Sequence, residues 1–494
     1  MLGGVAAATV GGLGACRRDD SGGGDTAADA GSDLDERYDV CVIGSGFAGT
    51  FLALRTADAG LRTIVVEAGS QRGDREFADD PARAFRFSTS GPIEYPVNYA
   101  RLIAVGGASG HWTGLVNRMR PSDFRLRSEF GLDVDWPLAY ADLEPYYCRA
   151  EQALAVNGRA PVEGAEPPRT CAYPVQAPDP YRPPRVRFEG APVRMFSVAR
   201  SRRDGEPLRL GRREVLAFRD SPNGYLLAKH RAIRLVPRDP RTVDHLEVRP
   251  LDGAPKRIRA RCFVVAAGAV ESARLLLLSH SDGFPRGLGN AHDLLGRYFL
   301  GHVTVNWRFG PRTLGGLYPG NHRSYDFYDA FRRRGLGACH YQLFVSETQQ
   351  VVWKLQPEME ARPENRIALS SGETDAWGLP IPDLALAFSE RDRRTLAEGE
   401  RFLRAQAQAL NADPAGIGRR ATWRAHPSGT CRMGFDERGG VVDRDNRVFG
   451  VDNLYVSGAC TFPTSGTANP TLTVVALTLR LADHLVARAS RAHG

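Results

Sequence analysis

The sequence has few cysteines, no long apolar run and almost no lysine. Its eight cysteines in 494 residues include no CxxC pair, which excludes a disulfide-rich secreted scaffold and the usual zinc-ribbon and thioredoxin-type sites. No apolar run reaches the roughly 18 residues that a membrane-spanning helix needs. The composition is otherwise globular, with 42% hydrophobic and 25% charged residues, which excludes wholesale disorder and fibrous repeats.

The positive charge comes almost entirely from arginine. The net charge is +8, from 65 basic and 57 acidic residues, and the only lysines are Lys229, Lys256 and Lys354. The arginines are dispersed among acidic residues, and the longest basic run covers only 332–334. A nucleic-acid-binding protein gathers its basic residues into a patch, so this pattern indicates a solvated surface and no nucleic-acid partner.

Residues 1–34 are not expected to belong to the fold. Residues 1–15 are small and apolar, Cys16 follows them, and the linker after it is polar and rich in glycine and aspartate. An apolar run of this length is typical of a signal peptide, and the tetrad 13–16 resembles a bacterial lipobox. No basic residue precedes the run. The favoured reading is export, with a lipid anchor at Cys16; a loose tail on a cytoplasmic protein is the alternative.

A glycine-rich turn between two apolar runs predicts a dinucleotide-binding unit. The run 38–43 has strand length and leads into Gly44, Gly46 and Gly49, and the next run ends at Glu67. Gly44 permits a tight turn, Gly46 lets a diphosphate approach the backbone, and Gly49 lets the following helix pack on the strand. The helix N-terminus offers N–H groups to the diphosphate, and Glu67 is placed to accept hydrogen bonds from ribose hydroxyls.

Two further segments are expected to converge on the nucleotide. Gly106 and Gly107 are adjacent glycines, which are typical of backbone that presses closely against another group. The run 258–265 predicts a strand that ends near Ala267 and Gly268, before a helical pattern. This is a second strand–turn–helix unit of the kind that binds nucleotides.

The chain resembles the glucose-methanol-choline (GMC) family of flavoproteins from about Tyr38 to its C-terminus. The resemblance implies FAD, which the glycine motif alone does not distinguish from NAD. Its form is closest to pyranose oxidases and bacterial sugar or glucoside dehydrogenases. The segments that carry the resemblance are 44–49 with Glu67, 105–112, 136–154, 264–279, and 426–434 with 464–473.

The resemblance implies further contacts with FAD. In fungal pyranose oxidases the histidine at the position of His111 is bonded covalently to the flavin, but Gly110 replaces the threonine that precedes it there, so packing against the flavin ring is favoured over a covalent bond. Thr113 matches a position near flavin N5. Gly458 stands where many members have an acidic residue, so a backbone contact would have to substitute. The other matching positions are Ala232, Ala459, Pro470 and Thr471.

His426 and Asn469 match the catalytic pair of the family. Removing a hydroxyl proton suits an imidazole, and a side-chain amide can hold the oxygen that becomes an alkoxide. Pro470 directly follows Asn469 and opens a long apolar pattern, which predicts a helix. In the family this helix points at the flavin, where its dipole stabilises the negative charge of the reduced ring.

The landmarks predict an α/β protein (α+β overall). A Rossmann-like FAD-binding domain is expected from residues 35–124, 223–302 and 419–494. A substrate-binding domain on an antiparallel sheet is expected from the insertions 125–222 and 303–418, in which 341–346 and 351–356 are strand-like and the proline-rich stretch 165–192 is expected to form surface loops.

The predicted activity is the oxidation of a secondary hydroxyl of a pyranose or glycoside to a ketone. Hydride passes to flavin N5, and His426 is the general base. The electrons go to a quinone, a cytochrome or dioxygen, with a dehydrogenase slightly favoured. One alternative is another alcohol as substrate: a polyol, a sugar acid or a hydrophobic alcohol. A less favoured alternative is an NAD(P)H-linked or electron-transfer flavoprotein. Such a protein would need a second GxGxxG unit or a redox CxxC pair, and the sequence has neither. No metal-ligand cluster is evident, and the sequence leaves the oligomeric state open.

Overall fold

A computed structural model describes residues 37–70, 86–96, 101–177, 183–250, 252–309, 320–346, 351–409 and 419–493. Residues 34–494 group into one compact unit. Residues 1–34, with the proposed lipidation site Cys16, lie outside the described residues. None of the described helices combines the length and apolar character needed to cross a membrane.

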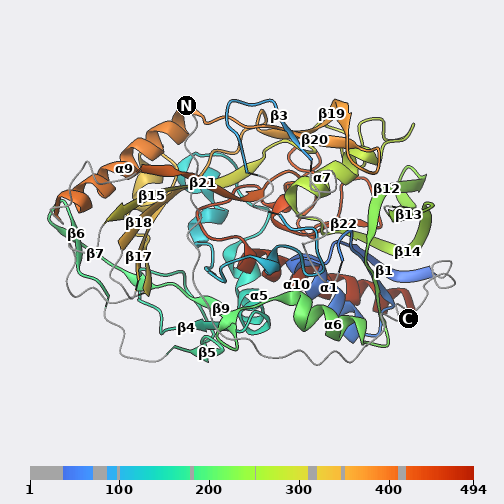
Figure 1. The fold of residues 1–494 in the computed structure, drawn as a ribbon, viewed down its shortest axis with the longest axis horizontal. Helices are drawn as coiled ribbons and strands as arrows, with labels where there is room; N and C mark the ends of the chain where they lie inside the picture. The colour runs from blue at the N-terminus through green and yellow to red at the C-terminus, as the bar shows by residue number, and fades with distance from the viewer. Residues whose placement is uncertain are drawn as a thin grey trace, which may run out of the picture. The chain divides into compact units, whose positions relative to one another are not determined.

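A seven-stranded sheet forms one half of this unit (Figure 1). Its parallel part has the order β11-β2-β1-β14, and β22 runs parallel to the last residues of β14. The first residues of β14 pair instead with an antiparallel hairpin, β13-β12. The strands are β1 (Arg37–Ile43), β2 (Thr63–Val66), β11 (Gly224–Leu227), β12 (His230–Asp239), β13 (Thr242–Pro250), β14 (Lys256–Val265) and β22 (Leu454–Val456).

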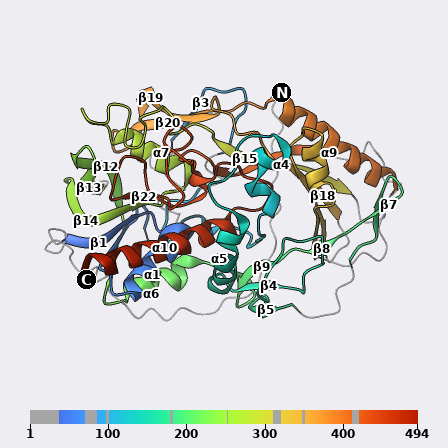
Figure 2. The ribbon, with the colours of Figure 1, turned by 180° about the vertical axis from the view of Figure 1, so that it is seen from behind.

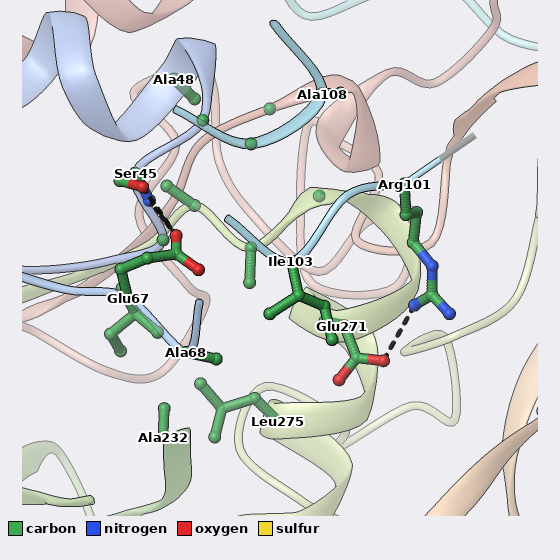
Figure 3. A pocket seen from close by; sticks show the side chains of 18 of the residues that line it. Ser45, Ala48, Glu67, Ala68, Arg101, Ile103, Ala108, Ala232, Glu271 and Leu275 are labelled. Atoms are coloured by element: carbon green, nitrogen blue, oxygen red, sulfur yellow. Dashed lines mark hydrogen bonds and ion pairs between the residues drawn. The ribbon is translucent and has the colours of Figure 1, made fainter. Parts of the chain in front are cut away.

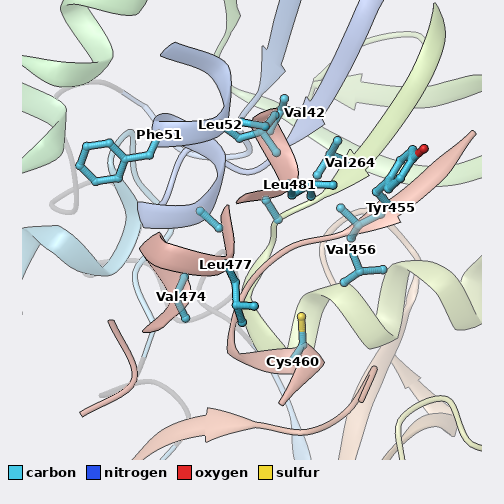
Figure 4. Packing of buried hydrophobic residues seen from close by; sticks show 14 of the residues in the cluster. Val42, Phe51, Leu52, Val264, Tyr455, Val456, Cys460, Val474, Leu477 and Leu481 are labelled. Carbon is cyan, nitrogen blue, oxygen red and sulfur yellow. The ribbon is translucent and has the colours of Figure 1, made fainter. Parts of the chain in front are cut away.

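Helices cover this sheet and close its core. Helix α10 lies beside α1 and α5 in both views (Figures 1 and 2). In Figure 4, Val42 of β1 lies beside Leu52 of α1, and both belong to the same buried cluster as Val264 of β14 and Leu477 of α10. Burying each such side chain contributes about 1.5–3 kcal/mol. The α-helices among the described residues are α1 (Phe47–Asp58), α4 (Leu126–Phe130), α5 (Tyr140–Ala153), α6 (Glu214–Arg219), α7 (Gly268–Leu278), α8 (Tyr328–Arg333), α9 (Glu390–Ala409) and α10 (Thr471–His493).

A second sheet is antiparallel, with the order β21-β15-β18-β17-β16-β8. One face is apolar and packs on α9, where Phe402 touches Tyr341 and Trp353. The strands are β8 (Phe196–Ser197), β15 (Leu300–Phe309), β16 (Gly320–Ser324), β17 (Cys339–Val345), β18 (Val351–Pro357) and β21 (Arg419–Ser428). The predicted combination of a nucleotide-binding parallel sheet and an antiparallel sheet is confirmed.

Smaller sheets complete the described structure. The stretch 165–192, expected as surface loop, also contributes short strands. The small sheets are β19-β20-β3, β10-β9-β4-β5 and β6-β7. Their strands are β3 (Ser88–Thr89), β4 (Val156–Gly158), β5 (Val175–Gln176), β6 (Val186–Phe188), β7 (Ala191–Val193), β9 (Arg200–Arg203), β10 (Glu206–Pro207), β19 (Arg366–Thr374) and β20 (Pro380–Ala385).

Two segments pack in the structure with a different part of the fold from the domain to which the sequence assigned them. Strand β21 and the first residues of β15 lie in the segments assigned to the FAD domain, yet they pair in the second sheet. Helix α5 lies in a segment assigned to the substrate domain, yet it packs against α10. Strand pairing and packing cannot be read from local sequence patterns, and the exact domain limits stay a prediction.

Cys148 and Cys171 form a disulfide, with their Cα atoms 6.0 Å apart. It joins the C-terminal half of α5 to the loop that follows β4. The sequence excluded only a disulfide-rich scaffold and did not predict this single bond. The free cysteines among the described residues are Cys41, Cys262, Cys339, Cys431 and Cys460.

Candidate active site

A cavity lies at the carboxyl ends of the parallel strands. Because all five strands run the same way, their C-terminal loops meet at one edge of the sheet, which is where α/β folds bind ligands. Figure 3 shows the part of this cavity between Ser45, Glu67, Ala108, Ala232 and Leu275. Among the residues predicted to bind FAD, those that line it are Gly44, Gly46, Glu67, Gly107, Ala232, Ala267, Gly268, Gly458 and Ala459.

The three glycines of the first turn have different environments. Gly44 has φ +104°, and a Cβ there would lie 2.7 Å from the carbonyl oxygen of Ala266. A Cβ on Gly49 would lie 1.8 Å from the Gly44 carbonyl oxygen, so this glycine lets α1 pack closely, as predicted. Gly46 has an ordinary φ of −69° and no neighbouring atom within 4 Å of a Cβ. Neither conformation nor protein packing requires a glycine there, and the open space fits a diphosphate at the N-terminus of α1.

Glu67 is held in place by three hydrogen bonds. Its Oε2 accepts the N–H of Ser45 at 3.0 Å and the Ser45 hydroxyl at 2.7 Å, and its Oε1 accepts the N–H of Gly69 at 2.8 Å. Burial raises the pKa of Glu67, and the three donors oppose that shift. The carboxylate is therefore fixed at the end of β2, where the sequence predicted a contact with the ribose. Ser45, within the glycine motif, was not predicted.

Replacing Glu67 by glutamine should weaken FAD binding roughly 10- to 100-fold, because a hydrogen bond to a charged group contributes about 1.5–3 kcal/mol. The measurement is the dissociation constant of the refolded or stripped protein for FAD. Glu247→Gln is a matched control, because Glu247 pairs with Arg234 on β12, and neither residue lines the cavity. Equal affinities for the wild type and Glu67→Gln would contradict the assignment.

The other end of the cavity carries a buried group of charges that the sequence did not predict. Glu271 accepts a hydrogen bond from Arg101 at 2.8 Å and from Arg231 at 2.6 Å, and Arg274 lies 3.3 Å away. Burial alone would raise the pKa of Glu271, but the three arginines lower it to about 2. Figure 3 shows the ion pair between Arg101 and Glu271 at the edge of the cavity. The carboxylate thus stays ionised and fixes the arginines.

Several predicted FAD contacts lie outside the lining of this cavity. His111 and Thr113 are exposed, and their contacts with the flavin ring stay a prediction. Gly106 has φ +91°, and its N–H donates to the Ser45 hydroxyl at 3.0 Å, so it supports the glycine turn. Pro470 precedes the first residue of α10, Thr471, and its carbonyl accepts the N–H of Val474. The predicted helix is thus confirmed, with Val474 lining the cavity.

The structure brings His426 and Asn469 together. The Nδ2 atom of Asn469 lies 3.4 Å from Nε2 of His426. His426 lies at the end of β21, where the pairing with β15 shifts register between Leu300 and His302. A β-bulge of this kind redirects a side chain. The residue has φ +64°, a conformation that costs about 1–3 kcal/mol and that gathers at functional sites.

Asn469 has its amide orientation fixed by two donors. Its Oδ1 accepts a hydrogen bond from Arg323 at 3.0 Å and from Asn117 at 3.3 Å. Because Oδ1 accepts these two hydrogen bonds, the NH₂ group of the amide faces His426. Neither Arg323 nor Asn117 was predicted from the sequence.

A second histidine, also not predicted, contacts the first. His302 is 2% exposed, and its Nδ1 lies 2.9 Å from Nδ1 of His426. Burial lowers the pKa of His302 to about 4. Burial, His302 and the charge of Arg323 lower the pKa of His426 well below its ordinary 6.5. Both imidazoles are therefore neutral at pH 7, and His426 can accept a proton.

Comparison with known proteins agrees with this site. Residues 361–478 match the GMC oxidoreductase family, and residues 39–79 match the FAD binding domain. The chain is 30% identical to the 6'''-hydroxyparomomycin C oxidase of Streptomyces lividus over 92% of this chain and 93% of that one. It is 25% identical to the fructose dehydrogenase large subunit of Gluconobacter japonicus, over 91% and 97% of the two chains.

The fold has solved counterparts as well. The structure of a pyridoxine 4-oxidase from Mesorbium loti has a TM-score of 0.63 at 19% identity and covers 91% of this chain and 99% of that one. The sequence relatives extend over nearly the whole chain, and the cavity has the open glycine turn and fixed carboxylate that FAD needs. The chain therefore belongs to the GMC oxidoreductase family, its cofactor is FAD, and it is an oxidoreductase that acts on CH–OH donors.

Proposed function

We propose that the protein oxidises a secondary hydroxyl of a pyranose or glycoside to a ketone. The observation that carries this proposal is the polar face of the second sheet. Asn306, Lys354, Gln342 and Arg323 stand side by side on four neighbouring strands. They lie on the face opposite to α9, and Arg323 reaches Asn469 from it. A face built from amide and cationic groups suits a polyhydroxylated substrate and disfavours a hydrophobic alcohol.

The neighbouring row of the same face is also polar. His340 and Gln356 are cross-strand partners, and Thr304 donates to the Gln356 side chain at 3.3 Å. Relatives named for fructose, hydroxyparomomycin C and C-glycosides support a sugar substrate for this chain.

The chemistry follows from the two side chains that meet at the site. His426 Nε2 takes the hydroxyl proton, and the Asn469 amide donates a hydrogen bond to the oxygen as it gains negative charge. The charge of Arg323, transmitted through the amide that it holds, favours the same negative oxygen. Bound FAD supplies the acceptor for the hydride that leaves the substrate carbon.

A substrate panel tests this proposal. Neutral methyl glycosides, an amino sugar, a sugar acid and a hydrophobic alcohol of similar size are compared by kcat/KM with an artificial electron acceptor, and the sugar product is analysed for a ketone. A neutral pyranose or glycoside should be preferred and should yield a keto sugar. A strong preference for the hydrophobic alcohol would contradict the proposal.

A sugar acid is the second candidate substrate. Arg323 and Lys354 are basic side chains, and Arg323 donates hydrogen bonds to the Tyr325 hydroxyl at 3.3 Å and to the Asn469 side-chain oxygen at 3.0 Å, neither of which carries a negative charge. Burial and the charges of Arg323 and Arg308 lower the pKa of Lys354, which an anionic substrate would reverse. If a sugar acid is the substrate, its kcat/KM in the panel should exceed that of the corresponding neutral sugar.

The electron acceptor is proposed to be a quinone or cytochrome rather than dioxygen. This choice follows from the proposed anchoring at a membrane surface and from the resemblance to a dehydrogenase subunit. Reduced protein is mixed with air-saturated buffer or with a quinone. Faster reoxidation by the quinone is expected, and fast reoxidation in air with stoichiometric hydrogen peroxide would reverse the choice.

Export with lipidation at Cys16 is proposed on the lipobox-like tetrad, and the disulfide Cys148–Cys171 supports it, because disulfides persist in oxidising compartments. Expressed in a bacterium, the full chain should take up labelled palmitate and fractionate with membranes. Cys16→Ser should abolish both, whereas Cys148→Ser, a matched control, should leave the label in place. An unlabelled cytoplasmic product would contradict export.

A further inference from the structure

The hydrogen bonds around His302 determine where its proton lies. Its Nε2 is 3.0 Å from the carbonyl oxygen of Gly466, which can only accept a hydrogen bond. Nε2 therefore carries the hydrogen of the neutral ring. Nδ1 is left with a lone pair and must act as an acceptor.

Gln356 gives independent support for this assignment. Its Nε2 lies 2.6 Å from the carbonyl oxygen of Thr467, so this end of the amide must be the NH₂ group. The same nitrogen lies 3.1 Å from Nδ1 of His302 and can only donate to it. Two hydrogen bonds to fixed carbonyl groups thus orient both side chains, and each makes His302 Nδ1 an acceptor.

The proton position of His426 follows. Its Nδ1 lies 2.9 Å from His302 Nδ1, and since His302 accepts there, His426 Nδ1 must donate. The Nε2 atom of a neutral His426 is then unprotonated, and this is the atom that faces Asn469. In an isolated neutral imidazole either nitrogen can carry the hydrogen, so its Nε2 is unprotonated only part of the time.

We propose that His302 is a positioning residue that keeps the hydrogen of His426 on Nδ1, so that Nε2 is always free to take the substrate proton. When the substrate O–H bond breaks, its proton goes to His426 Nε2. The resulting imidazolium keeps its Nδ1–H bond to His302, whose Nε2–H bond to Gly466 is unchanged. This inference rests on the proposed role of His426 as the base.

A pair of amide variants separates this role from a merely structural one. Asparagine at position 302 can place an oxygen where Nδ1 lies, whereas glutamine can place its amide where Nε2 lies and leaves no acceptor for His426. His302→Gln and His302→Leu should slow anaerobic flavin reduction roughly 10- to 100-fold, the effect of losing one hydrogen bond to a group that becomes charged. His302→Asn should recover most of the rate. Equal rates for the Asn and Gln variants, or recovery by Gln alone, would overturn the proposal.

A spectroscopic measurement makes the test independent of activity. In protein with ¹⁵N-labelled histidine, the signals that vanish in His426→Ala belong to His426, and they should show an unprotonated Nε2 in the wild type. This pattern should persist in His302→Asn and in the control His340→Gln, which removes a buried imidazole bonded to Thr467. It should be lost in His302→Leu. A wild-type His426 protonated on Nε2 would overturn the inference, even if no His302 variant folds and even if His426 is essential for activity.

Discussion

Replacing His426 by alanine is expected to slow anaerobic reduction of the bound flavin by roughly 10²- to 10⁴-fold, the usual contribution of a positioned general base. FAD should remain bound, because its predicted contacts at Gly44, Gly46 and Glu67 follow β1 and β2, whereas His426 lies on β21. Reoxidation should change less, since no substrate proton is transferred in that step. The measurement is stopped-flow absorbance of the oxidised flavin after mixing with sugar in the absence of oxygen.

The neighbouring amide provides the comparison. Asn469→Ala should give a smaller loss in the same step, because it removes one hydrogen bond to the developing alkoxide. The double variant should lose less than the product of the two single losses, since both side chains act on one oxygen. A near-normal rate of flavin reduction in His426→Ala would show that the chemistry lies elsewhere.

Gly46→Val should give a folded protein that binds FAD at least about 100-fold more weakly. A Cβ at Gly46 meets no protein atom within 4 Å, so the side chain fits the protein but occupies the space proposed for the diphosphate. Losing two hydrogen bonds to a charged group accounts for this magnitude. The measurement is the FAD content of the purified protein together with its dissociation constant.

Gly283→Val is the matched control for this variant. Gly283 likewise has no atom within 4 Å of a Cβ, and it lies outside the lining of the cavity. Both variants should keep the circular dichroism spectrum of the wild type, and only Gly46→Val should be colourless. A yellow Gly46→Val protein with normal affinity would contradict the placement of the diphosphate.

The nucleotide-binding unit was predictable because its signals are local. The run 38–43 and the run 258–265 became β1 and β14. Gly44 has the positive φ of a tight turn, and Gly49 has the close contact that its position predicted. His426 and Asn469 were predicted from the resemblance of their motifs to the GMC family, and the fold places them together. These features depend on a few consecutive residues, which a single sequence contains.

The residues that orient the predicted catalytic pair, His426 and Asn469, were not predictable in the same way. His302 reaches His426 only because β15 pairs with β21 through a bulge, and strand pairing is not encoded in a short window. A weak signal existed, because His302, Thr304 and Asn306 alternate with valines, which is typical of a strand with one polar face. That alternation does not predict which residues the polar face contacts, and so it does not predict the contact between His302 and His426.

The pH dependence of anaerobic flavin reduction tests the central claim most directly. The pKa of His426 is lowered, so its base form is already complete at neutral pH. Over about pH 5 to 9 the wild-type rate should be constant in neutral and alkaline solution and should fall only in acid, as His426 gains a proton below its ordinary pKa of about 6.5. In His426→Ala the rate should be low and should lack this fall. An identical acid fall in both proteins, or a wild-type fall centred above the ordinary histidine pKa of about 6.5, would contradict the role of His426 as the base.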